Sequence, residues 1–150
     1  MSDIQSAEMY GLEAPKLDWF LAMLVDLAND RGLGLGVTLQ VGGFLVTGSL
    51  VSGKDYFEGL ASVIASAIPD EQAAKVVRDS FAHLGDIYDA DKIADSESRK
   101  TVFIHLKGAR FVVPGHRPIP DETGVWWRGR LSEVTGFLPG TLSDRGNDDA

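Results

Sequence analysis

The sequence has no cysteine and no long run of apolar residues, and each absence excludes a class of function. Without cysteine, the chain forms no disulfide, carries no thiolate nucleophile and offers no cysteine ligand to zinc. The start of the chain lacks the basic region and apolar run of a signal peptide, and no apolar stretch is long enough to span a bilayer. We therefore expect a cytoplasmic protein.

Positive charge is scarce, with 14 Lys and Arg against 22 Asp and Glu and a net charge of −8. This balance disfavours nonspecific nucleic-acid binding, which depends on neutralising phosphates. The charge is also uneven, because residues 99–130 hold seven bases and two acids whereas residues 54–98 hold four bases and ten acids. The two regions could attract each other within one molecule or between molecules.

Residues for catalysis or metal binding are sparse. The histidines stand in separate segments, without a second metal-type ligand on the same helix face: His83, His105 and His116. Asp89, Asp91 and Asp95 resemble a calcium loop, but Ile93 and Ala94 stand where a ligand and the turn glycine belong. We therefore predict no catalytic, cofactor-binding or metal-binding residue and no enzymatic activity.

The most regular stretch runs from residue 33 to residue 52. Apolar residues alternate with small or polar ones at Leu33, Leu35, Val37, Leu39 and Val41. Such alternation predicts a strand with one buried face. Gly42-Gly43 predicts a tight turn into a second strand, in which Gly48 indicates a bulge or bend. We therefore predict an α+β fold with a small, strongly bent antiparallel β-barrel.

The rest of the chain predicts a single domain, 1–150. A helix over 16–29 precedes the hairpin, with Gly32 as its C-cap, and helices over 54–68 and 70–87 form an insertion between the second and third strands. Lys107-Gly108-Ala109 indicates a turn. The predicted segments are a flexible tail at 1–14, helix and hairpin at 15–53, helical insertion and acidic linker at 54–100, strands at 101–106, 110–113, 125–134 and 137–142, and a disordered acidic tail at 143–150.

Candidate binding residues lie mainly in the segment Trp126-Trp127-Arg128-Gly129-Arg130. Tryptophan and arginine are enriched in binding hot spots. On a strand, Trp126 would be exposed beside Arg128 and Arg130, or both tryptophans would be buried, one in the barrel and one under a helix. Trp19 widens the apolar face of the first helix, which either lies in the core or also contacts a neighbouring subunit. The predicted protein-interaction residues are Trp126, Arg128, Arg130, Arg110 and Trp19.

Two resemblances follow from these residues. The helix, the bent hairpin with Gly48 and the Leu-Lys-Gly turn at 106–108 resemble the Sm-like (or SH3-like) fold. A more distinctive set resembles the gas vesicle accessory protein GvpU family: Phe103-Ile104-His105-Leu106-Lys107, Trp127-Arg128-Gly129-Arg130, Glu133-Val134, Gly136-Phe137, Gly140 and Ser143-Asp144. Residues 34–57, with Ser52 and the Tyr56-Phe57 pair, also resemble that family.

The GvpU resemblance implies a non-enzymatic protein that acts in the assembly, regulation or clustering of gas vesicles through protein contacts. It supplies no catalytic residue and implies no cofactor. Its expected partners are further copies of the chain, the vesicle shell or other accessory proteins. The alternative is an Sm-like nucleic-acid-binding regulator that uses Arg110, Arg128 and Arg130.

Overall fold

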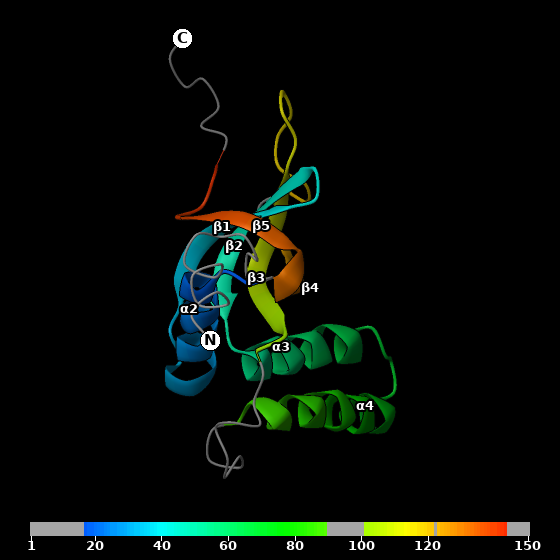
Figure 1. Cartoon of the computed structure of the whole chain (residues 1–150). Helices are drawn as coiled ribbons and strands as arrows, with labels where there is room; N and C mark the ends of the chain where they lie inside the picture. Colours follow the sequence, from blue (N-terminus) through cyan, green and yellow to red (C-terminus); the bar gives the residue numbers. More distant parts are fainter. Residues whose placement is uncertain (1–16, 90–100, 122, 144–150) are drawn as a thin grey trace, which may run out of the picture.

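The computed structural model describes residues 17–89, 101–121 and 123–143. It is an α+β arrangement in which a helix covers one face of an antiparallel sheet and a helical hairpin packs at one end (Figure 1). The predicted tails and most of the predicted acidic linker lie outside the described residues. Element labels follow Figure 1.

The first helix, α2 (Trp19–Arg31), begins and ends on capping residues that the sequence supplies. The Asp18 carboxylate accepts hydrogen bonds from the backbone N–H groups of Phe20 and Leu21, which have no partner within the helix. Gly32 ends the helix at φ 70°, so the predicted C-cap is confirmed. The predicted helix is correct, although it starts and ends two to three residues later than 16–29.

The sheet has five strands in the order β4-β3-β2-β1-β5. The strands are β1 (Leu35–Val41), β2 (Phe44–Val51), β3 (Phe103–Val112), β4 (Val125–Arg130) and β5 (Val134–Pro139). The predicted hairpin is confirmed, because Val41 pairs with Phe44 across the Gly42-Gly43 turn. The ladder shifts register between Thr47 and Ser49, as Gly48 predicted.

The predicted barrel is wrong in one respect, because the sheet is not closed. In the described chain β4 pairs with β3 and β5 pairs with β1, so β4 and β5 are the two edges. A short 3₁₀ helix, η4 (Leu131–Glu133), carries the chain from one edge strand to the other. Closure requires a ladder between these strands, and the described residues form no such ladder.

Three strand boundaries also differ from prediction. Lys107-Gly108-Ala109 is not a turn, because β3 runs through it with a register shift. The predicted strand 125–134 ends at Arg130, where η4 begins. The predicted Thr135-Gly136 turn lies inside β5, because Gly136 pairs with Gln40 of β1.

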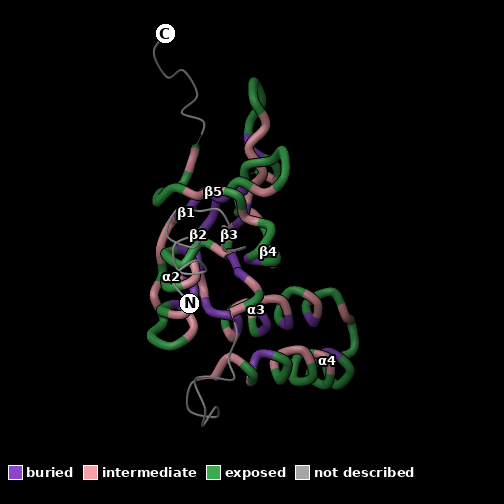
Figure 2. The backbone as a smooth tube through the Cα atoms, viewed as in Figure 1, coloured by how far each residue is buried: buried purple, intermediate pink, exposed green. Residues whose placement is uncertain are grey.

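The main core lies between α2 and the sheet (Figure 2). Leu21, Val25 and Ala28 of α2 are almost fully buried, and their spacing of four and three residues places them on one helix face. The facing sheet residues in this core are Val37, Leu39, Val46, Leu50, Ile104, Leu106 and Ala109, joined by Leu131 of η4. Trp127 packs against this core from β4.

The predicted helical insertion between the second and third strands is present. It contains α3 (Gly53–Ser66), α4 (Glu71–His83) and the 3₁₀ helix η1 (Leu84–Tyr88). Helices α3 and α4 pack side by side beyond the end of β3 (Figure 1). We call these three elements the helical lobe.

Candidate functional site

An aromatic cluster joins the helical lobe to the face of the sheet opposite α2. Tyr56 and Phe57 of α3 and Tyr88 of η1 surround His105 of β3. The His105 ring centroid lies 4.8 Å from that of Tyr56 and 5.2 Å from that of Tyr88. These spacings are typical of favourable aromatic contacts, so the cluster fixes the lobe against the sheet.

Glycines in α3 make this close packing possible. A Cβ on Gly59 would lie 2.0 Å from the Trp126 ring, and a Cβ on Gly53 would lie 2.4 Å from the Tyr88 ring. No side chain at either position fits without moving a ring. Glycine within a helix costs about 0.5–1 kcal/mol relative to alanine, and here the contact that it permits offsets that cost.

His105 is the most unusual residue of the cluster. Its side chain is 1% exposed, and neither ring nitrogen has a hydrogen-bond partner. Burial, together with the smaller effect of the positive charge of Arg128, lowers the pKa of the imidazole to about 3. The ring is therefore neutral at ordinary pH and sealed from solvent.

Arg128 also belongs to this cluster. Its guanidinium lies 3.8 Å from the ring centroid of Phe103 and 5.2 Å from that of Phe57. Both distances are within the range of a cation–π contact. The positive charge of Arg128 is thus partly stabilised by the two aromatic rings. Burial raises the pKa of the Tyr88 hydroxyl, and the positive charge of Arg128 opposes this effect.

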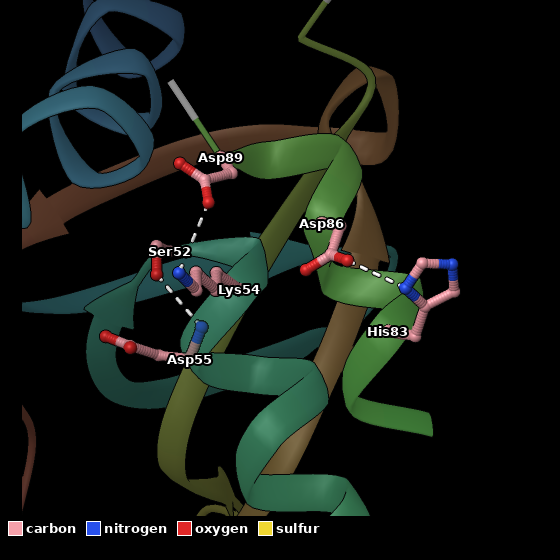
Figure 3. Close-up of polar contacts among 6 residues, drawn as sticks. All are labelled: Ser52, Lys54, Asp55, His83, Asp86 and Asp89. Carbon is pink, nitrogen blue, oxygen red and sulfur yellow. Dashed lines mark hydrogen bonds and ion pairs between the residues drawn. The ribbon is translucent and has the colours of Figure 1, made fainter. Parts of the chain in front are cut away.

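Polar contacts lie at the ends of the helices of the lobe, and the contact between Lys54 and Asp89 links its first helix to the end of its last (Figure 3). Lys54 Nζ lies 3.4 Å from the Asp89 carboxylate, whose charge raises the Lys54 pKa. The Ser52 hydroxyl caps α3 by accepting a hydrogen bond of 3.0 Å from the Asp55 N–H. His83, exposed on α4, contacts the Asp86 carboxylate at 2.7 Å.

The predicted interaction residues do not form one surface. Trp126 is half-buried against α3, and Trp127, also half-buried, packs against the main core. The structure brings Trp126 and Arg128 together at the lobe, whereas Arg130 is exposed at the end of β4. Arg110 donates a hydrogen bond of 3.4 Å to the Leu142 carbonyl.

Trp19 lies on a separate, exposed surface. It is 74% exposed, and Met23 and Leu27 follow at intervals of four residues along the same side of α2. Phe20, 41% exposed, extends this side toward β5, where its ring centroid lies 5.5 Å from that of Phe137. We call Trp19, Phe20, Met23 and Leu27 the outer face of α2.

Sequence reasoning missed the partners of His105. It also missed the packing of Trp126 against α3, although a signal for it was present, since Gly59 interrupts an otherwise good helix and indicates that something packs closely there. Within the described residues, no three His, Asp or Glu side chains come together as a metal site would require. Across the same part of the chain, no helix has both the length and the apolar character needed to cross a membrane.

The comparisons with known proteins give one family. The model of the family described as "Gas vesicle protein GvpU-like" matches residues 18–142. A search of curated proteins found no match, and neither did a search of solved structures. The matched range begins at the N-cap of α2 and ends beyond β5, so it includes every helix and strand described above. The chain therefore belongs to the GvpU-like family of gas vesicle proteins, as the motifs of β3 and β4 predicted.

Proposed function

We propose that this gas vesicle-related protein is a non-enzymatic accessory protein that acts in vesicle assembly, regulation or clustering through protein–protein contacts. The outer face of α2 is the observation that carries the proposal. Large apolar side chains gathered on one exposed side of a helix are typical of a surface that binds another protein. The proposal locates the protein in the cytoplasm, at gas vesicles.

A second copy of the chain is the partner that we propose for this surface. The outer face of α2 continues toward the edge strand β5, where Leu138 is 45% exposed. Edge strands also offer unpaired backbone groups to another chain, although Pro139 limits pairing at the end of β5. Contacts repeated in an oligomer would let weak individual binding accumulate on a repetitive vesicle shell.

The placement of the helix and strands supports the finer prediction of an Sm-like arrangement. One helix precedes five antiparallel strands, and a 3₁₀ turn separates the last two. The associated alternative, nucleic-acid binding through Arg110, Arg128 and Arg130, has less support. Arg128 is partly buried where the helical lobe meets the sheet, and its guanidinium lies over the rings of Phe103 and Phe57.

Light scattering after size exclusion, at low and high salt, tests the proposal. We compare the wild type with the double variant Trp19→Lys/Met23→Lys. Val76→Lys on α4 is the matched control, because Val76 is also a large exposed apolar residue, at 65%. We expect wild type and control to give an oligomeric mass at both salt concentrations and the double variant to give the monomer mass.

The effect of salt separates the two possible contacts. Apolar association persists at high salt, whereas attraction between the acidic and basic parts of the chain is screened. An oligomer that dissociates only at high salt would assign the contact to charge. A monomeric wild type, or a double variant that associates like the wild type, would contradict the role of the outer face of α2.

A further inference from the structure

A cavity of about 370 Å³ lies on the face of the sheet opposite α2, between β2 and β3. It shares this face with the aromatic cluster, because Lys107 and His105 are two residues apart on β3. Its lining combines basic and hydroxyl side chains with glycine backbone: Thr47, Gly48, Ser49, Lys107, Gly108, Arg110, Thr123 and Thr141. This composition differs from that of an apolar pocket and favours a polar, negatively charged ligand.

A β-bulge in β3 creates the basic side of the cavity. In a regular strand Lys107 and Arg110, three residues apart, would point to opposite faces. Here Gly48 of β2 faces an extra residue of β3, because Thr47 pairs with Arg110 while Ser49 pairs with Lys107. The extra residue places both basic residues on the side of the sheet that carries the cavity and leaves Ala109 in the main core. On that side Lys107 Nζ also lies 5.8 Å from the centroid of the Trp126 ring.

The register against β4 shifts at the same point. Leu106 pairs with Trp127 and Ala109 pairs with Val125, so two residues of β3 face one residue of β4. Gly108, within the bulge, has φ 61°, a conformation that glycine adopts without strain. Bulges are common next to binding sites because they redirect side chains, as this one does.

The segment after β5 forms a wall of the cavity and is held by specific hydrogen bonds. The Thr38 hydroxyl donates to the Gly140 carbonyl at 2.9 Å, and the Leu142 N–H donates to the Thr47 hydroxyl at 2.8 Å. Arg110 donates one long hydrogen bond, of 3.4 Å, to the Leu142 carbonyl. A guanidinium has five N–H donors, so most of those of Arg110 remain for a ligand.

The charged residues among the described lining of the cavity are opposite in sign to the net charge of the protein. Lys107 and Arg110 are cationic, and the described residues that line it include no carboxylate, although the chain has a net charge of −8. Threonine and serine hydroxyls add donors around the two cations. We propose that this cavity binds the phosphate group of a phosphorylated small molecule, which Arg110 and Lys107 would contact by charge-assisted hydrogen bonds.

The dimensions favour a small ligand over a polynucleotide. The volume is within the range of small-molecule sites, and it exceeds what inorganic phosphate alone would fill. A second cavity, of about 480 Å³, is lined by Leu142, the neighbour of Thr141, and by Arg117 and His116. Polynucleotide binding needs many phosphate contacts, which two cations do not provide.

Titration followed by ¹⁵N NMR tests this proposal, which is independent of the proposed function. The probes are inorganic phosphate and adenosine monophosphate, each against sodium chloride at equal ionic strength. We expect saturable shifts of the Gly108, Arg110 and Thr123 amides with both phosphates, and tighter binding of the nucleotide. The double variant Lys107→Gln/Arg110→Gln should weaken this binding at least about tenfold, because it removes both charged donors.

The variant Lys75→Gln/Arg78→Gln, on exposed positions of α4, removes the same charge far from the cavity and should bind like the wild type. Thermal unfolding of both variants checks that they are folded. Equal shifts with chloride, or binding that survives in folded Lys107→Gln/Arg110→Gln, would overturn the proposal. So would binding of an RNA oligonucleotide without any response to the two small phosphates.

Discussion

Replacing His105 with leucine should make the protein more resistant to acid. His105 is buried and neutral, and its ring nitrogens have no hydrogen-bond partner. The unfolded chain binds a proton on this imidazole near pH 6.5, whereas the folded chain does so only near pH 3. Between these values the unfolded state holds more protons, so the free energy of unfolding falls as the pH falls.

The expected size follows from the difference of about 3.5 between the two pKa values, 6.5 minus 3. It corresponds to about 5 kcal/mol when the pH has fallen through the whole window, and to about 2 kcal/mol between pH 7 and pH 5. Leucine is close to histidine in volume and does not titrate. The stability of His105→Leu relative to wild type should therefore increase by about 2 kcal/mol between pH 7 and pH 5.

The pH dependence is a better test than the difference at pH 7 alone. At pH 7 the variant removes unpartnered polar atoms, which stabilises it by about 1–3 kcal/mol, but it also loses ring contacts with Tyr56 and Tyr88 worth about 0.5–1.5 kcal/mol each. Carboxylates titrate in both proteins and cancel in the comparison.

Urea unfolding followed by tryptophan fluorescence at pH 7, 6 and 5 gives the measurement, provided that the m-values agree. His116→Gln is the control, because His116 is exposed in the loop between β3 and β4. The control should keep a constant stability difference from wild type. If His105→Leu also keeps a constant difference from pH 7 to pH 5, His105 is not buried and neutral as described.

Two further substitutions test contacts on the same face of the sheet. Gly59→Ala should destabilise the protein by about 1–3 kcal/mol in urea unfolding, because the new Cβ meets the Trp126 ring, whereas Gly43→Ala, which meets nothing within 4 Å, should change it little. A stabilised Gly59→Ala, as helix propensity alone would give, would refute that packing. Thr47→Val should speed hydrogen exchange at the Leu142 amide and cost about 1–3 kcal/mol, because it removes the acceptor of that amide. Unchanged exchange would show that this hydrogen bond does not hold the segment.

Local sequence patterns were sufficient to predict the elements that depend on residues close to one another in the chain. Alternating apolar residues and Gly42-Gly43 specified the first hairpin, and Gly32 specified the end of α2. The motifs of β3 and β4 were sufficient for the family. These features depend on neighbours in the sequence, which a single sequence displays.

Features that depend on distant partners were predicted less well. Thr135-Gly136 looks like a turn, but pairing with β1 makes it part of a strand. The local sequence Lys107-Gly108-Ala109 is compatible with either a turn or a bulge. It forms a bulge because β3 pairs with β2 on one side and with β4 on the other. Closure of the sheet likewise depends on its two edges, which no local pattern reveals.

In the candidate site, too, the local arrangement was predictable from the sequence and the packing of distant elements was not. The sequence placed Trp126 beside Arg128 on one side of a strand, and in the structure both side chains contact α3. It left open which side is covered, because that depends on how α3 packs against the sheet. Trp19 is exposed on α2, so it does not lie in the core, which was one of the two positions that the sequence left open.

Flotation with purified gas vesicles is the most direct test of the central claim, that the protein acts by contact at vesicles. Vesicles rise on centrifugation, so a bound protein is recovered with them. We expect the wild type and Val76→Lys to float with the vesicles, and Trp19→Lys/Met23→Lys to stay in solution because it cannot form the oligomer that binds multivalently. Wild-type protein that stays in solution, or a double variant that floats as well as the wild type, would contradict the account.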